Sequence, residues 1–310
     1  MVSPLPTKEA RMSKPAKVAM VTGASRGIGR GCALELAKKG FDVVLCARTV
    51  KEGQAFEHSS TVKKSDTTPL PGSLESVAKE IIALGRQALV VKLDLLARKE
   101  VEAAVETALR QWGRIDVLVN NARYIGPGHM DWFVDTPVEL FDQHLQCNVL
   151  SPLLLCKLVI PAMRKQGGGV IINVTSAAGW HETPNMLGAG GWGLGYSVSK
   201  AAFNRIAPGL AKELKQFNIA VINLEPGFVG TERLAQDMGP FGFDVSKALG
   251  VDVPGLTCAF LATHPTPLYY SGMNVFAPGF VVDHKLVDSA KLPPPYGPTM
   301  WGMPRPTLPG

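Results

Sequence analysis

Short, strongly apolar segments alternate with longer amphipathic segments along most of this chain. The apolar segments, which we expect to be strands, cover 17–23, 41–47, 87–94, 115–122, 169–176 and 219–227. Helical periodicity lies between them, at 27–40, 74–85, 100–113, 137–167 and 195–217. Apolar strands that alternate with helices are typical of a parallel sheet with helices on both faces. The pattern therefore predicts an α/β fold, a single doubly wound domain over residues 16–287.

Both ends of the chain and one internal segment depart from this alternation. Residues 1–15 are polar and contain prolines, so we expect a flexible leader rather than a signal peptide. Residues 288–310 are rich in proline and are expected to form a tail without a helix or a central strand. The polar stretch 49–72 predicts a loop, which at this length is either functional or poorly ordered.

Three prolines fall inside predicted helices. A proline in a helix interior removes one hydrogen bond and crowds the preceding turn. Pro208 is therefore expected to kink the helix at 195–217, and Pro152 and Pro161 are expected to bend or end the helix at 137–167.

Composition narrows the possible function classes. The chain of 310 residues carries 32 Lys and Arg against 26 Asp and Glu but has no run of five basic residues, so no nucleic-acid partner is expected. Its five cysteines form no C-x-x-C pair and its six histidines show no ligand spacing, so neither a disulfide framework nor a metal site is predicted. Apolar surroundings of the cysteines, with no apolar run of 18 residues, favour a cytoplasmic protein without a membrane span.

A glycine-rich turn, TGASRGIG at 22–29, joins the first predicted strand to the first predicted helix. Its glycines allow the backbone to turn tightly and to approach a diphosphate without a Cβ clash. The first N–H groups of the helix then face the anion, which the helix dipole also favours. The turn predicts a nucleotide-phosphate site formed by Gly23, Ser25, Arg26, Gly27, Ile28 and Gly29.

The spacing TGxxxGxG differs from the G-x-G-x-x-G of the common dinucleotide fingerprint. With this spacing the chain resembles the short-chain dehydrogenases/reductases, and the resemblance covers 17–285. The segment 49–72, with the LPGSLESVAKEI that begins in it at residue 70, resembles a hydroxysteroid-dehydrogenase-like subgroup. The resemblance implies a Rossmann-like domain with seven parallel strands in the order 3-2-1-4-5-6-7, and a homodimer or homotetramer.

Charge at the end of the second strand bears on the choice of cofactor. Family members that prefer NAD carry an aspartate there, which binds the ribose 2′-hydroxyl, whereas this chain has Ala47 followed by Arg48. The Arg48 guanidinium suits a 2′-phosphate, and Arg26 adds a second positive charge, so the resemblance implies NADP(H) rather than NAD(H). It also implies cofactor contacts from Asp94, Leu95, Asn121, Tyr196, Lys200, Pro226, Gly227, Val229 and Thr231.

The segment YSVSK places Tyr196 and Lys200 one helical turn apart on the same face. A phenol is a weak acid–base catalyst at neutral pH, and an adjacent ammonium favours its ionised form. The resemblance implies that Tyr196 exchanges the proton, that Ser176 holds the substrate oxygen, and that Asn148 supports a proton relay through its backbone carbonyl. Thr175 is the alternative to Ser176.

The chain departs from the family's pattern in two places near these residues. Arg123 ends NNAR, where the family has glycine; either the loop differs locally, or Arg123 reaches a phosphate or an acidic group of the substrate. Ser176 and Tyr196 are 20 positions apart, further than in most relatives, and 232–250 is expected to be a substrate lid. Candidate pocket residues are Trp132, Phe133, Trp180, His181, Trp192 and Phe241.

The resemblance therefore implies an NADP(H)-dependent enzyme that interconverts an alcohol and a carbonyl in a small-molecule substrate. One alternative is an enoyl reductase or dehydratase-like relative, although the close spacing of Tyr196 and Lys200 disfavours an enoyl reductase. The other is a catalytically silent nucleotide-binding protein, against which the complete set of four catalytic positions argues.

Overall fold

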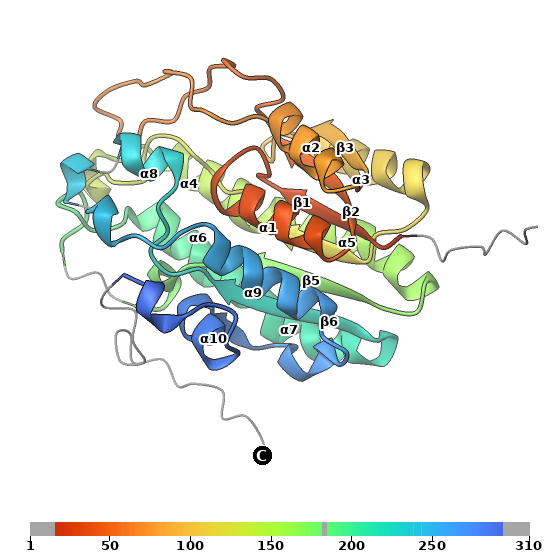
Figure 1. Ribbon diagram of the computed structural model, residues 1–310. Coiled ribbons are helices and arrows are strands. Elements are labelled where there is room, and N and C mark those ends of the chain that lie inside the picture. Colours follow the sequence, from red (N-terminus) through yellow and green to blue (C-terminus); the bar gives the residue numbers. More distant parts are fainter. Residues whose placement is uncertain (1–15, 182–184, 238, 243, 294–310) are drawn as a thin grey trace, which may run out of the picture.

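Seven parallel strands form one sheet at the centre of the molecule (Figure 1). The computed structural model describes residues 16–181, 185–237, 239–242 and 244–293. The strand order is β3-β2-β1-β4-β5-β6-β7, which confirms the predicted topology. The strands are β1 Val18–Thr22, β2 Asp42–Ala47, β3 Ala88–Lys92, β4 Val117–Asn120, β5 Gly169–Val174, β6 Ile219–Glu225 and β7 Asn274–Phe276.

Helices cover both faces of the sheet, as the near-continuous apolar strands require. They are α1 Gly27–Lys38, α2 Leu74–Ala83, α3 Arg98–Trp112, α4 Val138–Leu145, α5 Ser151–Lys165, α6 Leu194–Asn204, α7 Ile206–Leu214, α8 Glu232–Asp237, α9 Asp252–Thr263 and α10 Ala277–Asp283. Successive side chains of a strand point to opposite faces. In β1, Ala19 and Val21 therefore join the core under α1 and α9, whereas Val18 and Met20 join the core under α3 and α5.

The helix predicted at 137–167 is interrupted by a π-helical turn, Gln146–Leu150, between α4 and α5. The interruption does not lie at the prolines: Pro152 lies in the first turn of α5 and Pro161 lies inside it. By length and composition alone the stretch Val138–Lys165 could cross a membrane, but α5 contacts α3 and the strands β4 and β5, as a core helix does. The π turn matters because it carries Asn148.

The helix predicted at 195–217 is divided into α6 and α7 at Arg205. Pro208 has no N–H to donate to the carbonyl of Asn204, four residues earlier. That carbonyl instead accepts a hydrogen bond from Nδ2 of Asn223, on β6, at 2.7 Å. The helix is thus interrupted near Pro208, as expected, and the turn of α6 that holds Tyr196 and Lys200 precedes the interruption.

The segment 49–72 contains no helix or strand, but three sets of contacts order it. Arg26 donates hydrogen bonds to the carbonyl groups of Leu70, Pro71 and Gly72. The Thr61 hydroxyl donates to Asp131 at 2.5 Å, and Nη2 of Arg233, in α8, donates to the Ser60 hydroxyl at 2.7 Å. Figure 1 shows the segment as the orange loop that extends toward α8. Of the two alternatives for 49–72, a poorly ordered loop is wrong.

The other departures from regular alternation are only partly described. The leader 1–15 and residues 294–310 of the tail lie outside the described residues, as do 182–184, 238 and 243. Residues 288–293 include a short 3-10 helix, Ser289–Lys291, where no helix was expected. The predicted lid, 232–250, holds α8 and the 3-10 helices Gly239–Phe241 and Val245–Lys247.

Candidate active site

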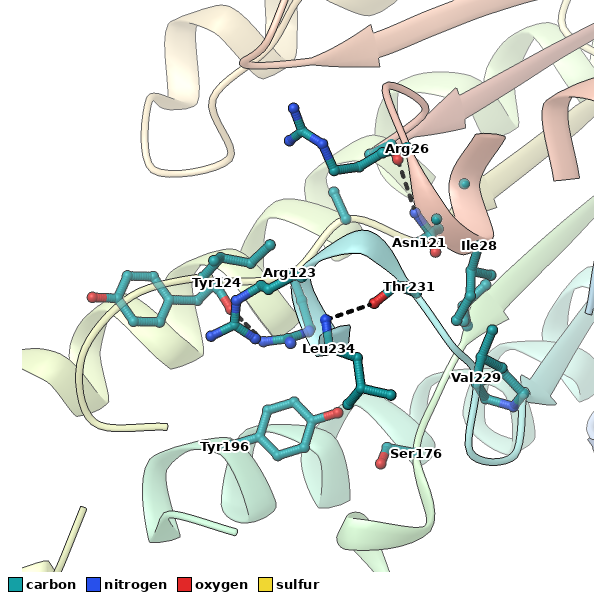
Figure 2. Close-up of a pocket in the computed structure, with 18 of the residues that line it drawn as sticks. Arg26, Ile28, Asn121, Arg123, Tyr124, Ser176, Tyr196, Val229, Thr231 and Leu234 are labelled. Carbon is teal, nitrogen blue, oxygen red and sulfur yellow. Dashed lines mark hydrogen bonds between the residues drawn. The ribbon is translucent and has the colours of Figure 1, made fainter. Parts of the chain in front are cut away.

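A cavity of about 730 Å³ lies at the carboxyl ends of the strands. In doubly wound sheets, ligands bind at this edge, where the strand order reverses. Residues that follow β1, β2, β4, β5 and β6 line it, and the segments 49–72 and 232–250 add further walls. Figure 2 shows side chains from several of these loops facing one cavity.

The glycine-rich turn forms one end of this cavity. Gly23 and Gly27 have φ of +68° and +55°, a conformation that favours glycine. A Cβ on Gly29 would lie 2.1 Å from the carbonyl oxygen of Gly23, so the backbone there has no room for a side chain. No side chain among the described residues caps α1, and the cavity is lined by its first residues, Gly27, Ile28 and Gly29. The turn therefore fits an anionic diphosphate.

Two arginines lie near the end of β2, and they differ in function. Arg48 lines the cavity, and its Cζ lies 5.0 Å from the ring centroid of Phe56, in the segment 49–72. It forms no hydrogen bond or ion pair with the described residues, so its donors are available to a ligand. Arg26 also lines the cavity, but its guanidinium is hydrogen-bonded to the carbonyl groups of 70–72. Arg26 thus holds the segment 49–72 over the cavity, a role that its sequence position did not reveal.

The remaining predicted cofactor residues line the same cavity: Ser25, Asp94, Leu95, Asn121, Pro226, Gly227, Val229 and Thr231. The Asn121 amide donates to the carbonyl oxygen of Thr22 at 2.8 Å and so braces the start of the glycine-rich turn. Thr231 accepts a hydrogen bond from the Leu234 N–H at 3.3 Å, within the first turn of α8. The structure therefore brings these predicted residues together at one cavity, from four separate loops.

Tyr196, Lys200 and Ser176 meet at the other end of the cavity. Lys200 is buried, its Nζ donates to the carbonyl oxygen of Val174 at 2.9 Å, and it lies 5.9 Å from the Tyr196 ring centroid. Ser176 accepts a hydrogen bond from the Ala178 N–H at 3.2 Å, which leaves its own O–H able to donate to a ligand. Figure 2 shows Ser176 beside the hydroxyl end of Tyr196. The alternative, Thr175, is buried and donates to the carbonyl oxygen of Leu224 at 3.3 Å.

Asn148 connects the π turn to these groups through its side chain. Its Oδ1 accepts from the Tyr124 N–H at 2.7 Å, and its Nδ2 donates to the Ser199 hydroxyl at 2.9 Å. Ser199 lies on α6 beside Lys200, and its hydroxyl donates in turn to the carbonyl oxygen of Tyr196. The amide therefore fixes α6 relative to the loop after β4, an arrangement that the sequence prediction, which concerned the backbone carbonyl, did not include.

Charges around Lys200 are poorly compensated. Burial and, to a smaller extent, the positive charge of Arg123 lower the pKa of Lys200 to about 7, although the charge of Glu225 acts in the opposite direction. Burial likewise raises the pKa of Glu225 to about 7, although hydrogen bonds from the N–H groups of Gly227 and Ala177 favour its ionised form. Glu225 was not among the predicted site residues. Its position at the end of β6, directly before Pro226, was the available signal.

Aromatic side chains surround the Tyr196 ring. His129, Trp192 and His144 have ring centroids 4.5, 5.5 and 6.4 Å from it. Of the six predicted pocket residues, His181, Trp192 and Phe241 line the cavity, whereas Trp132, Phe133 and Trp180 do not. The two buried histidines were not predicted: His129 lies in the irregular loop between β4 and α4, and His144 is the buried residue of α4.

The buried histidines are expected to make the protein less stable in acid. Burial lowers the pKa of His144 to about 3 and that of His129 well below its usual value, and neither ring forms a hydrogen bond with the described residues. Between the unfolded pKa, about 6.5, and the folded value, only the unfolded chain binds the proton, so stability falls as the pH falls. His144 alone should remove about 2 kcal/mol between pH 7 and pH 5.

Urea unfolding of the wild type and of His144→Phe at both pH values measures this effect. The comparison uses the change between the two pH values, so that any cost of repacking cancels. His144→Phe should lose about 2 kcal/mol less than the wild type between pH 7 and pH 5. If the wild type and His144→Phe lost the same stability between pH 7 and pH 5, His144 would not be the source of the acid sensitivity.

Comparison with known proteins agrees with this geometry. The family model for short chain dehydrogenase matches residues 17–73 and 67–238. The chain is 33% identical over 271 residues to a 3-oxoacyl-[acyl-carrier-protein] reductase of Synechocystis, a match that covers 86% of this chain and 97% of that protein. It is 32% identical to the 7alpha-hydroxysteroid dehydrogenase of Escherichia coli K12, over 72% of this chain and 75% of the enzyme. A metagenomic short-chain oxidoreductase solved with NADP superposes with a TM-score of 0.64 and 30% identity, over 84% and 96% of the two chains.

Proposed function

Because the chain belongs to the short-chain dehydrogenase/reductase family, we propose that it uses NADP(H) to interconvert a secondary alcohol and a ketone or aldehyde. The observation that carries the proposal is one continuous cavity with two distinct ends. Gly23–Gly29 and Arg48 form an end that fits phosphates, and Tyr196, Ser176 and Lys200 form an end that fits proton transfer. A bound nicotinamide nucleotide would supply the hydride.

The residues around Tyr196 transfer the proton, hold the substrate oxygen and position α6. In the direction of reduction, the Tyr196 hydroxyl gives its proton to the substrate oxygen, and in oxidation it takes the proton back. The Ser176 O–H donates to the same oxygen and holds it beside Tyr196. Lys200 uses one of its three donors on Val174, which leaves two for ribose hydroxyls and for support of the ionised phenol. Asn148 is a positioning residue, because its amide holds α6 through Ser199.

Arg48 is expected to set the preference for NADPH over NADH. Hydrogen bonds to a charged group contribute about 1.5–3 kcal/mol, so Arg48→Ala should weaken NADPH binding about 10- to 100-fold and leave NADH binding nearly unchanged. Fluorescence titration of both nucleotides measures this. Arg30→Ala is the control, because Arg30 pairs with Glu80 at 2.6 Å and does not line the cavity. If Arg48→Ala weakened the binding of NADPH and NADH equally, Arg48 would not bind the 2′-phosphate.

The relatives support alcohol–carbonyl chemistry over the alternatives. One is named for the reduction of a 3-oxoacyl group and another for the dehydrogenation of a hydroxysteroid. A silent nucleotide-binding protein would bind NADPH but would reduce no carbonyl compound. An enoyl reductase would reduce a conjugated carbon–carbon double bond and leave simple ketones unchanged. NADPH oxidation with a panel of ketones, aldehydes and enones separates the three.

Exposed apolar side chains in three consecutive segments support a homodimer or homotetramer. They lie on the segment before α4, on α4 and on the π turn: Phe133, Val134, Val138, Leu145 and Leu150 are 36–86% exposed. Several large exposed apolar side chains in consecutive segments are typical of a subunit interface. We assign the subunit contact to these segments; the cytoplasmic location stays a prediction.

A further inference from the structure

Arg123 places a guanidinium directly at the proton-transfer end of the cavity. It lies in the loop after β4, and its Cζ is 5.3 Å from the Tyr196 ring centroid. Figure 2 shows Arg123 and Tyr196 facing the same cavity. Among non-glycine residues described in the structure, only Asn218 and Lys285 have positive φ, so Arg123 occupies the glycine position of the family's motif without backbone strain.

The guanidinium has few partners in the protein. Its Nη1 donates to the carbonyl oxygen of Tyr124 at 2.9 Å, and its other nitrogens donate to none of the described residues. No carboxylate within the described part of the chain forms an ion pair with it. Burial lowers the pKa of Arg123, while the interaction with Tyr196 raises it. Arg123 is half-buried, and a charge partly withdrawn from water without a counter-ion is costly; an arginine also presents five donors in a planar fork that matches a carboxylate.

The position of Arg123 indicates which ligand supplies the missing negative charge. The phosphate-binding end of the cavity already has the N-terminus of α1 and Arg48. Arg123 instead contacts Tyr196, where the substrate carbonyl must lie for proton transfer. Its charge also lowers the pKa of Lys200, so an anion bound to Arg123 would offset the repulsion between the two cations. The cavity walls include the apolar side chains of Trp192, Leu234 and Phe241, and the Trp192 ring centroid lies 5.5 Å from that of Tyr196.

We propose that Arg123 binds a carboxylate of the substrate, and that the enzyme reduces oxo acids, or oxidises hydroxy acids, with an apolar body. The carboxylate lies a few bonds from the reacting carbonyl, which reaches Tyr196 and Ser176. The reduction adds a hydride from the nucleotide to the carbonyl carbon and the Tyr196 proton to its oxygen, and Tyr196 then regains a proton from solvent. This substrate class rests on the proposed oxidoreductase function.

The test compares acids with their methyl esters. The substrates are octanoic acids with the oxo group one, two or three carbons from the carboxyl carbon, each paired with its ester. The wild type should prefer the acid, and Arg123→Met should lower the acid-to-ester ratio of kcat/KM about 30-fold or more. Arg123→Lys, which keeps the charge but not the fork, should lose less. KM for NADPH should change little in both variants.

A binding measurement separates this inference from the function on which it rests. Calorimetry with octanoate and octanamide on the NADP⁺-loaded protein should show octanoate binding that Arg123→Met abolishes. An enzyme that reduces ketones but has an unchanged acid-to-ester ratio in Arg123→Met would overturn the carboxylate site and leave the function intact. A higher KM for NADPH with an unchanged ratio would overturn it too, because Arg123 would then serve a cofactor phosphate. If nothing is reduced, the proposed function fails, and Arg123-dependent octanoate binding would still support the anion site.

Discussion

Replacement of Tyr196 by phenylalanine should lower kcat by about three orders of magnitude while NADPH binding stays nearly unchanged. General acid–base catalysis contributes about 10²- to 10⁴-fold, and the variant removes the hydroxyl while it keeps the ring among His129, Trp192 and Arg123. The cavity therefore keeps its shape and its glycine-rich end. NADPH oxidation with a reducible ketone or oxo acid, together with a fluorescence titration of NADPH, measures both quantities.

Tyr269→Phe is the matched control for this substitution. Tyr269 packs against Tyr270, with ring centroids 4.9 Å apart, and does not line the cavity. It should retain wild-type kcat. If Tyr196→Phe kept more than about a tenth of the wild-type kcat, Tyr196 would not be the proton donor. The Ser176 hydroxyl would then be the next candidate, because it lies in the same part of the cavity.

The fold could be predicted because its signals are local. β1, β2, β4 and β6 are runs of buried residues, β5 is buried except at its first residue, and β3, at the edge of the sheet, is a half-buried run that ends at the exposed Lys92. The prediction was less complete where structure depends on contacts between distant segments. β7 spans only Asn274–Phe276, too short to show a pattern of its own, and it is a strand because it pairs with β6. The π turn at Gln146–Leu150 carries no proline or glycine that would mark it.

In the candidate site, too, local signals could be predicted and contacts between distant segments could not. Tyr196 and Lys200 share a helix, and the glycine-rich turn is continuous in sequence, so spacing alone could place both. The role of Arg26 could not be predicted, because its partners lie more than 40 positions away in the segment 49–72. The sequence placed Arg123 beside the cofactor site and left its ligand open. Only the structure brings its guanidinium to the Tyr196 ring.

Gly29→Ala is the second substitution expected to have a large effect. The added Cβ would lie 2.1 Å from the carbonyl oxygen of Gly23 and 2.5 Å from Nδ2 of Asn121. The oxygen belongs to the backbone, so the first turn of α1 must move away from β1. Overpacking of this kind costs about 1–3 kcal/mol. The displaced N–H groups also lose their common direction toward the diphosphate, and NADPH affinity should fall about 100-fold or more.

Gly209→Ala separates this steric effect from the general consequence of adding a methyl group to a helix. Gly209 lies in α7, and a Cβ there would meet nothing within 4 Å. Alanine is favoured over glycine in a helix interior, so this control should gain about 0.5–1 kcal/mol of stability and bind NADPH normally. Urea unfolding and NADPH titration of both variants provide the comparison. The added carbon must change the geometry of the glycine-rich turn. If Gly29→Ala nevertheless bound NADPH with wild-type affinity, the turn would not hold the diphosphate.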